Sequence, residues 1–218
     1  SWSSQLSGRP SPFALVILMA SIVGRCTAYV HRKRAPDSMP PWDTRSDFSS
    51  ISSSLLLLES YSKVTTNPAS EITHSISGGS GPVDQSQVGH VIFAYALFHL
   101  CHCLLDHPFL MRLHLHPFES KTPRSFFDRV LQDTVTHARQ LCDLLHNATR
   151  AGYLVESSFY AYCSAVSGAI HSLAFQYECR TPAPNAPPSL NYFQCSVNFL
   201  DRLGSLWEHA ANMVLSLS

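Results

Sequence analysis

The densest group of side chains able to do chemistry lies at residues 99–109, HLCHCLLDHPF. His99, His102 and Cys103 are three and four residues apart, so a helix would place all three on one face. Imidazole and thiolate are ligands that zinc prefers, which makes these residues metal-ligand candidates. One straight helix cannot surround an ion, so further ligands would have to come from elsewhere in the chain. The candidates for those ligands are His137 and His171.

The competing interpretation of the same residues is structural. Polar side chains inside a protein are usually satisfied by neighbouring hydrogen-bonding groups, and such a cluster needs no metal. We favour this interpretation and expect no cofactor in the chain. A helical protein that binds a metal or a small effector is the alternative.

Motifs of known catalytic chemistry are absent from the sequence. It contains no G-x-S-x-G, no H-E-x-x-H and no phosphate-binding glycine loop. The glycines of SGGSGP at 77–82 follow no strand pattern and precede no Lys-Ser or Lys-Thr pair, which is typical of a linker. We therefore predict that the protein is not an enzyme.

Composition narrows the class of protein further. The 218 residues are 45% hydrophobic and only 14% charged, with 15 basic and 15 acidic side chains. A disordered charged tail needs a high net charge, and an autonomous DNA-binding domain usually has a basic excess to neutralise phosphates. Neither fits. A surface so poor in charge suggests that more chain or a partner protein covers part of it.

The seven cysteines form no C-x-x-C unit, which argues against a small secreted disulfide scaffold. Reduced and mostly buried thiols in an intracellular protein are expected instead. The apolar run 13–23 has eleven residues, whereas a bilayer span needs about 20. We expect a soluble protein with no membrane partner, and a secreted or membrane-associated helical protein is the weaker alternative.

A short basic cluster follows this apolar run, at His31, Arg32, Lys33 and Arg34. Such a cluster is a nuclear import candidate. The simpler interpretation is a helix C-terminus, where cations interact favourably with the helix dipole.

Hydrophobic spacing predicts an all-α fold with about six helices in an antiparallel array or bundle. Ser11 is placed to cap the first helix, and Asp43 or Ser46 to cap the second. The third is apolar on every side, as buried helices are, and Pro108 should end it. The expected helices cover 12–34, 43 or 46 to 61, 87–106, 122 or 123 to 147, 155–177 and 190–217, with a short turn at 109–115.

The expected organisation is one domain with a short lead-in. Residues 1–11 are rich in Ser and Pro and predict a flexible entry. Residues 12–218 form the helical domain, interrupted by a flexible loop at 64–86 and a Pro-rich loop at 180–189.

The order of these segments resembles the regulatory middle-homology region of fungal transcription factors that carry a six-cysteine zinc binuclear cluster. In that family a helix with an arginine and a tyrosine precedes a Pro-Trp-Asp element and a leucine-bearing helix, and a later helix reads similarly to YHLCHLLLHRPFL. The resemblance covers most of 12–178. The matching positions here are Ile22, Arg25, Tyr29, Pro41, Trp42, Asp43, Phe48, Leu55 to Leu58, His99, His107, Pro108 and Phe109.

The resemblance implies a role in the nucleus and leaves the mechanism open. It implies a helical region that controls transcriptional activation by RNA polymerase II through other segments of its own longer chain, coregulator proteins or a small effector. None of the seven cysteines fits the six-cysteine spacing of the DNA-binding cluster. Zinc and DNA contacts are therefore expected only in an N-terminal domain outside these residues.

Overall fold

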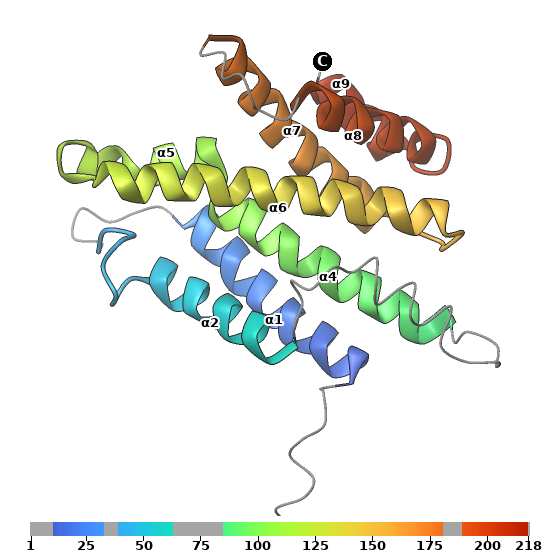
Figure 1. The fold of residues 1–218 in the computed structure, drawn as a ribbon, viewed down its shortest axis with the longest axis horizontal. Helices are drawn as coiled ribbons and strands as arrows, with labels where there is room; N and C mark the ends of the chain where they lie inside the picture. Colours follow the sequence, from blue (N-terminus) through green and yellow to red (C-terminus); the bar gives the residue numbers. More distant parts are fainter. Residues whose placement is uncertain (1–10, 33–38, 63–84, 181–188, 218) are drawn as a thin grey trace, which may run out of the picture.

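The computed structural model describes residues 11–32, 39–62, 85–180 and 189–217. Within these ranges the fold is all-α, as predicted, with eight α-helices and one 3₁₀ helix (Figure 1). The helices are α1 (Pro12–His31), α2 (Asp47–Ser62), α4 (Gln85–Leu105), α5 (Pro108–Leu115), η2 (His116–Lys121), α6 (Arg124–Arg150), α7 (Ser158–Arg180), α8 (Ser189–Gly204) and α9 (Glu208–Leu217).

Helix α4 lies at the centre of the fold. It packs against α1, α6 and α7, while α2 packs on the outer side of α1. Helix α7 continues the stack and carries α8 and α9 (Figure 1). Because α6 contacts α4, α7 and α8, it borders both the interior of the molecule and its C-terminal layer.

The prediction of a buried central helix is confirmed. Side chains on every side of α4 are inaccessible, including Ile92, Ala96, Leu100 and Cys103. Neighbours on three sides remove apolar surface from water, at about 25 cal/mol per Å² of buried area. An unbroken apolar sequence is therefore stable here as a helix in the core.

Two predicted elements are wrong in detail. The short turn at 109–115 is a full helix, α5, followed by η2, and the single helix expected at 190–217 is two helices, α8 and α9. The break at 205–207 lies where Leu206 and Trp207 donate backbone hydrogen bonds to the Leu203 carbonyl. The Trp207 indole also donates to the Glu156 carbonyl at 2.6 Å, which holds this corner against the α6–α7 turn.

Helix ends follow the local chemistry expected of them. Ser11 Oγ accepts from the Ala14 amide at 3.2 Å, which confirms the predicted cap of α1. Ser46 Oγ accepts from the Ser49 amide at 3.1 Å, so Ser46 caps α2 and Asp43 does not. Gly152 has φ +80°, a value that glycine adopts without strain, and it ends α6.

Some predicted segments lie partly outside the described residues. These are the entry at 1–11 apart from Ser11, the loop at 64–86 apart from 85–86, and the interior of the Pro-rich loop. The predicted first helix ends at His31 rather than at 34. At the far side of the Pro-rich loop, the Ser189 hydroxyl donates to Glu178 Oε1 at 2.6 Å, which joins the start of α8 to α7.

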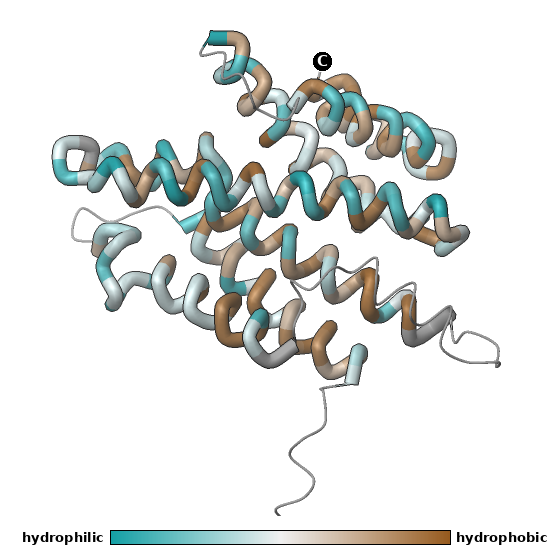
Figure 2. Tube along the Cα trace, in the orientation of Figure 1, coloured by the Kyte–Doolittle hydropathy of each residue, from teal (hydrophilic) through white to brown (hydrophobic). Residues whose placement is uncertain are grey.

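Two helices in the described ranges are long and apolar enough to cross a membrane, judged by length and composition alone. They are α1 and the Val88–Leu105 part of α4. Of the second span, 72% is buried inside the protein, as in the core helix of a soluble fold, against only 28% of α1. The whole of α1 is thus longer than the eleven-residue run considered in the sequence. Figure 2 shows brown, hydrophobic positions in the first half of α1 and at the end of α2.

Candidate functional site

The candidate ligands on α4 come together with a histidine of α6. The Nδ1 atoms of His99 and His137 lie 3.0 Å apart, within hydrogen-bonding distance. His102 stacks on the His137 ring, with centroids 3.8 Å apart and planes 4° from parallel. The fully buried Phe98 ring contacts all three imidazoles. His137 was one of the two candidates for a further metal ligand, and the structure places its ring beside His99 and His102.

This histidine cluster (His99, His102 and His137) is held in a low-polarity environment. Burial lowers the pKa of His99 to about 3, and the neighbouring His102 adds to the effect. Burial and the two other imidazoles lower the pKa of His137 to about 2. The uncharged form of both rings is therefore favoured at neutral pH. One Nδ1–H donates a hydrogen bond to the other Nδ1, so the Nδ1 atoms of His99 and His137 are each other's hydrogen-bond partners.

The other metal-ligand candidates lie elsewhere. Cys103 is buried, with Cys163 of α7 among its neighbours. His171 is stacked on Tyr192 of α8 instead, with ring centroids 5.1 Å apart. Among the described residues no three His, Cys, Asp or Glu side chains are arranged to hold a metal ion. The physical reason is that two nitrogens already share a hydrogen bond and the third ring lies flat against its neighbour.

Burial also separates the acid that ends this helix from water. Asp106 is buried, and its Oδ2 lies 3.7 Å from His102 Nδ1. Desolvation raises the pKa of Asp106 above its ordinary value, although His102 opposes the shift.

Several of the residues that carry the sequence resemblance form a second group of contacts, which joins α1 to α2 and α5. Arg25 of α1 donates to the hydroxyls of Ser50 and Ser54 on α2, both at 3.0 Å. Tyr29 stacks on His114 of α5, with centroids 4.8 Å apart. These contacts tie α1 to both α2 and α5.

The Pro-Trp-Asp element completes that assembly. Trp42 packs edge-on against Phe118 and Phe126, at centroid distances of 5.8 and 5.7 Å, and Phe48 packs against Phe126 at 5.6 Å. The Pro41 carbonyl accepts the Ser46 hydroxyl at 2.9 Å. A groove of about 620 Å³ opens beside these rings. We call Trp42, Phe48, Phe118 and Phe126 the aromatic cluster.

Asp43 acts locally within this element. Its carboxylate accepts from the backbone amide and the guanidinium of Arg45, at 2.9–3.1 Å. These hydrogen bonds lower the pKa of Asp43 to about 2. The pair fixes the turn that leads into α2.

The remaining family-motif residues mark the start of α5. His107 precedes the helix, and burial lowers its pKa. Pro108 is the first helical residue, where a missing amide costs nothing. Phe109 is 60% exposed and contributes little to the core.

The nuclear import candidate lies at the end of α1. His31 and Arg32 are exposed, and Arg32 donates to Asp47 at 2.6 Å. Lys33 and Arg34 lie outside the described residues. Of the two described residues of this cluster, Arg32 therefore takes part in an α1–α2 contact.

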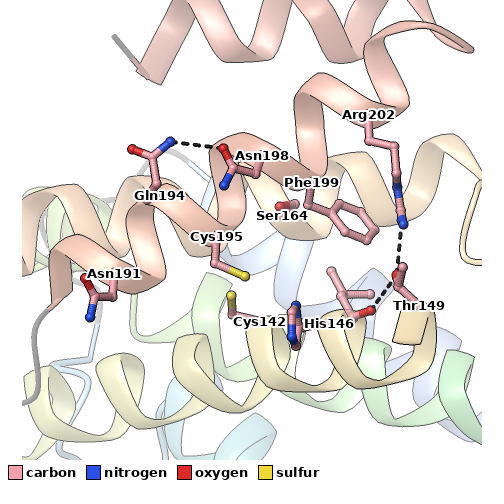
Figure 3. A pocket seen from close by; sticks show the side chains of 11 residues that line it. Cys142, His146, Thr149, Ser164, Asn191, Gln194, Cys195, Asn198, Phe199 and Arg202 are labelled. Atoms are coloured by element: carbon pink, nitrogen blue, oxygen red, sulfur yellow. Dashed lines mark hydrogen bonds between the residues drawn. The ribbon is translucent and has the colours of Figure 1, made fainter. Parts of the chain in front are cut away.

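A pocket that the sequence did not reveal lies between α6 and α8 (Figure 3). Its volume is about 510 Å³, and the Cys142 and Cys195 side chains point toward one another within it. The two cysteines are 53 positions apart and belong to no local motif, so only the packing of α6 on α8 brings them together. We call Cys142 and Cys195 the thiol pair. The other lining residues are Leu145, His146, Thr149, Ser164, Asn191, Gln194, Asn198, Phe199 and Arg202.

In comparisons with known proteins, no family model, no curated protein and no solved structure matches this chain.

Proposed function

We propose that this chain is the regulatory, middle-homology region of a fungal transcription factor, and that it controls transcriptional activation by RNA polymerase II in the nucleus. It works by protein contacts, performs no catalysis, and meets DNA only through a domain outside these residues. The supporting observation is the aromatic cluster with its neighbours. Tyr29, Trp42 and Phe48, all singled out by the family resemblance, are linked there by ring contacts through Phe126, and Arg25 joins α1 to α2 by its hydrogen bonds to Ser50 and Ser54.

That convergence matters because the matching residues come from separate segments. Tyr29 comes from α1, Trp42 from the turn that follows, and Phe48 from α2, and all pack toward α5 and α6. A motif that maintains one fold would gather them, as here.

The opposite end of the same two helices, away from the aromatic cluster, offers a place for a protein partner. Phe13, Ile17 and Leu18 on α1 are each about half exposed, as are Leu56 and Leu57 on α2. The bonds from Arg25 to Ser54 and from Arg32 to Asp47 align the two helices antiparallel, so these side chains lie at the same end. Contiguous exposed apolar residues are typical of protein interaction sites. The expected partners are other segments of the longer chain or a coregulator.

A reporter assay tests the proposal. The chain is inserted between an unrelated DNA-binding domain and a strong activation domain in a fungal cell. We expect several-fold lower reporter activity than from the same fusion without the chain. The double variant Ile17→Glu/Leu57→Glu should restore activity, because carboxylates on the apolar face oppose docking.

The matched control is Leu154→Glu, at an 80% exposed position on the α6–α7 turn. It should leave the repression intact. Equal reporter activity with and without the chain, at equal protein abundance, would contradict the proposal. So would a sequence-specific gel shift by the isolated chain at physiological salt.

The groove beside Trp42 supports a second candidate, a small effector. Thr44, Ser49, Ser52 and Ser53 supply hydroxyls, and Arg129 supplies one cation, with its guanidinium 5.6 Å from the Phe126 ring centre. This lining suits a small polar or anionic aromatic compound. A saturable rise in melting temperature with such a compound, lost in Arg129→Ala, would favour this candidate.

A further inference from the structure

The thiol pair is placed differently from the other cysteines in the described part of the chain. Cys142 comes from α6 and is 5% exposed, whereas Cys195 comes from α8 and is partly open to the pocket. Their sulfur atoms face one another across the helix contact (Figure 3). Cys142 Sγ also lies 3.9 Å from the Tyr192 carbonyl, so its proton can be directed either to that carbonyl or to Cys195. Two thiols are thus held together where a small solvent molecule can enter.

Hydrogen bonding within the pair shifts the pKa values of the two thiols in opposite directions. The Cys142 thiol donates to Cys195, which lowers the pKa of Cys195 to about 7, although burial and Asp143 oppose the shift. The same bond, with burial, raises the pKa of Cys142. The other titratable or charged groups near the pair are His146 and Arg139 on α6 and Tyr192 and Arg202 on α8, while α7 contributes the uncharged Ser164. Cys195 is the nucleophile of the pair, because its side chain is partly open to the pocket whereas Cys142 is buried, and its lowered pKa favours the reactive thiolate.

The remaining cysteines lack this combination. Cys26, Cys101, Cys103 and Cys163 are fully buried, which separates them from solutes. Burial, with neighbouring thiols, raises the pKa of Cys163, and the thiolate is correspondingly disfavoured. Cys179 is exposed, but no cysteine is placed beside it as Cys142 is beside Cys195.

We propose that Cys142 and Cys195 are a peroxide-sensitive modification site that forms a reversible disulfide between α6 and α8. The oxidant is hydrogen peroxide, and the reductant that reverses the bond is a dithiol. This chemistry goes beyond the transcriptional role proposed above and does not depend on it.

The reaction balances in two steps. The Cys195 thiolate attacks one peroxide oxygen, the O–O bond breaks, and the hydroxide that leaves takes a proton to become water. Cys195 is then a sulfenic acid. Cys142 attacks that sulfur, the S–O bond breaks, and the departing hydroxide takes the Cys142 proton as a second water. Peroxide gains two electrons, and each thiol loses one.

The bond would act directly on the pocket. Its two helices are the walls between which the cavity lies, and a covalent link fixes their separation. The link also closes a loop of more than 50 residues through α7, which restricts the unfolded chain and raises the melting temperature. Oxidation therefore replaces a noncovalent contact between the two helices with a covalent one.

The test treats the reduced whole chain with hydrogen peroxide, blocks remaining thiols with an alkylating agent, and identifies the linked peptides by mass spectrometry. We expect a Cys142–Cys195 peptide, a rise of several degrees in melting temperature, and reversal of both by a dithiol. The four core cysteines should remain available for alkylation after denaturation. Cys179→Ser is the matched control and should form the same link.

Two variants test the separate roles of Cys195 and Cys142 in this reaction. Cys142→Ser should stop the reaction at the Cys195 sulfenic acid, which dimedone traps, and Cys195→Ser should give neither product. Peroxide that produces no linked peptide, a disulfide that joins Cys179 instead, or the same yield of link in denaturing urea would each overturn the proposal.

Discussion

Helix α6 borders two groups of side chains that can carry charge, and the groups behave in opposite ways. Toward α4, His137 joins the histidine cluster, where burial favours neutral rings. Toward α8, Cys142 joins the thiol pair, where a hydrogen bond favours the charged form of its partner. The residue types alone would suggest metal chemistry at the first group and nothing at the second. Solvent access and the partner on the facing helix decide which group is reactive.

The largest expected effect tests how tightly the histidine cluster is packed. Phe98 is fully buried and contacts all three imidazoles, so Phe98→Ala removes the packing that holds the histidine cluster. We expect a loss of about 3–5 kcal/mol in unfolding free energy, measured in urea. The control Phe109→Ala, at a mostly exposed position, should change it by less than about 0.5 kcal/mol. Similar losses for both variants would mean that the cluster is loosely packed.

A second prediction concerns how the unfolding free energy changes as the pH is lowered. His99 and His137 have lowered pKa values in the folded chain, about 3 and 2, so the unfolded chain binds protons first, near pH 6.5. Their stabilising effect is complete above pH 6.5 and is lost as the pH falls from there toward 3. The raised pKa of Asp106 acts in the opposite sense, because the folded chain protonates that carboxyl first. The two histidines account for a loss of about 2.5 kcal/mol between pH 7 and 5.5, to which His107 and His171 add because burial lowers their pKa values too, and which Asp106 partly offsets.

The measurement is the unfolding free energy at several pH values. The double variant His99→Gln/His137→Gln should have a flatter profile over this interval, while His209→Gln, at an exposed position, should follow the parent. An unchanged slope in the double variant would show that other groups control the acid response.

A third prediction concerns the reactivity of the solvent-accessible thiol pair. Because the pKa of Cys195 is about 7, its alkylation rate should rise about tenfold between pH 6 and 8 and then level off. Mass spectrometry after brief iodoacetamide treatment would follow each site. Cys103 and Cys163 should remain unmodified in the folded chain, since both are fully buried. Modification of Cys103 at a rate like that of Cys195 would remove the contrast between the two groups.

The smallest expected effect comes from the pocket rim. The Arg202 guanidinium donates to Thr149 Oγ1 at 3.1 Å and lies 4.8 Å from the Phe199 ring centre, but the contact is exposed. Arg202→Ala should lower the unfolding free energy by less than about 1 kcal/mol, measured in urea. Arg202→Lys should recover only part of the loss, because lysine lacks the planar guanidinium. A loss above 2 kcal/mol would mean that the α6–α8 contact is as tightly held as the α4–α6 contact.

Sequence reasoning predicted the features that depend on neighbours along the chain. The buried character of α4 and the cap at Ser11 follow from hydrophobic spacing and backbone preference. Of the two candidates for a further ligand, His137 lies beside the α4 histidines, whereas His171 lies against Tyr192. The split between α8 and α9 was missed because the apolar stripe, including Leu203 and Ala210, continues across it.

The thiol pair could not be predicted for a different reason. Cys142 and Cys195 meet only after α7 has turned the chain back, so no spacing within one helix indicates their contact. The metal interpretation of His99, His102 and Cys103 depended on a shared face but lacked the neighbouring helices. These helices separate the candidates: α6 contributes His137 to the two histidines, and α7 brings Cys163 to Cys103.

The packing of α1 on α4 has a consequence for how the chain is made. The two helices contact each other extensively, yet α4 ends roughly 75 residues after α1. At about 5–20 residues per second, a ribosome releases α1 roughly 4–15 s before its partner is complete. During that interval Met19, Ile22 and Cys26, all buried in the finished fold, face water or a chaperone. The yield of native protein in a cell therefore depends on what shields α1 during those seconds.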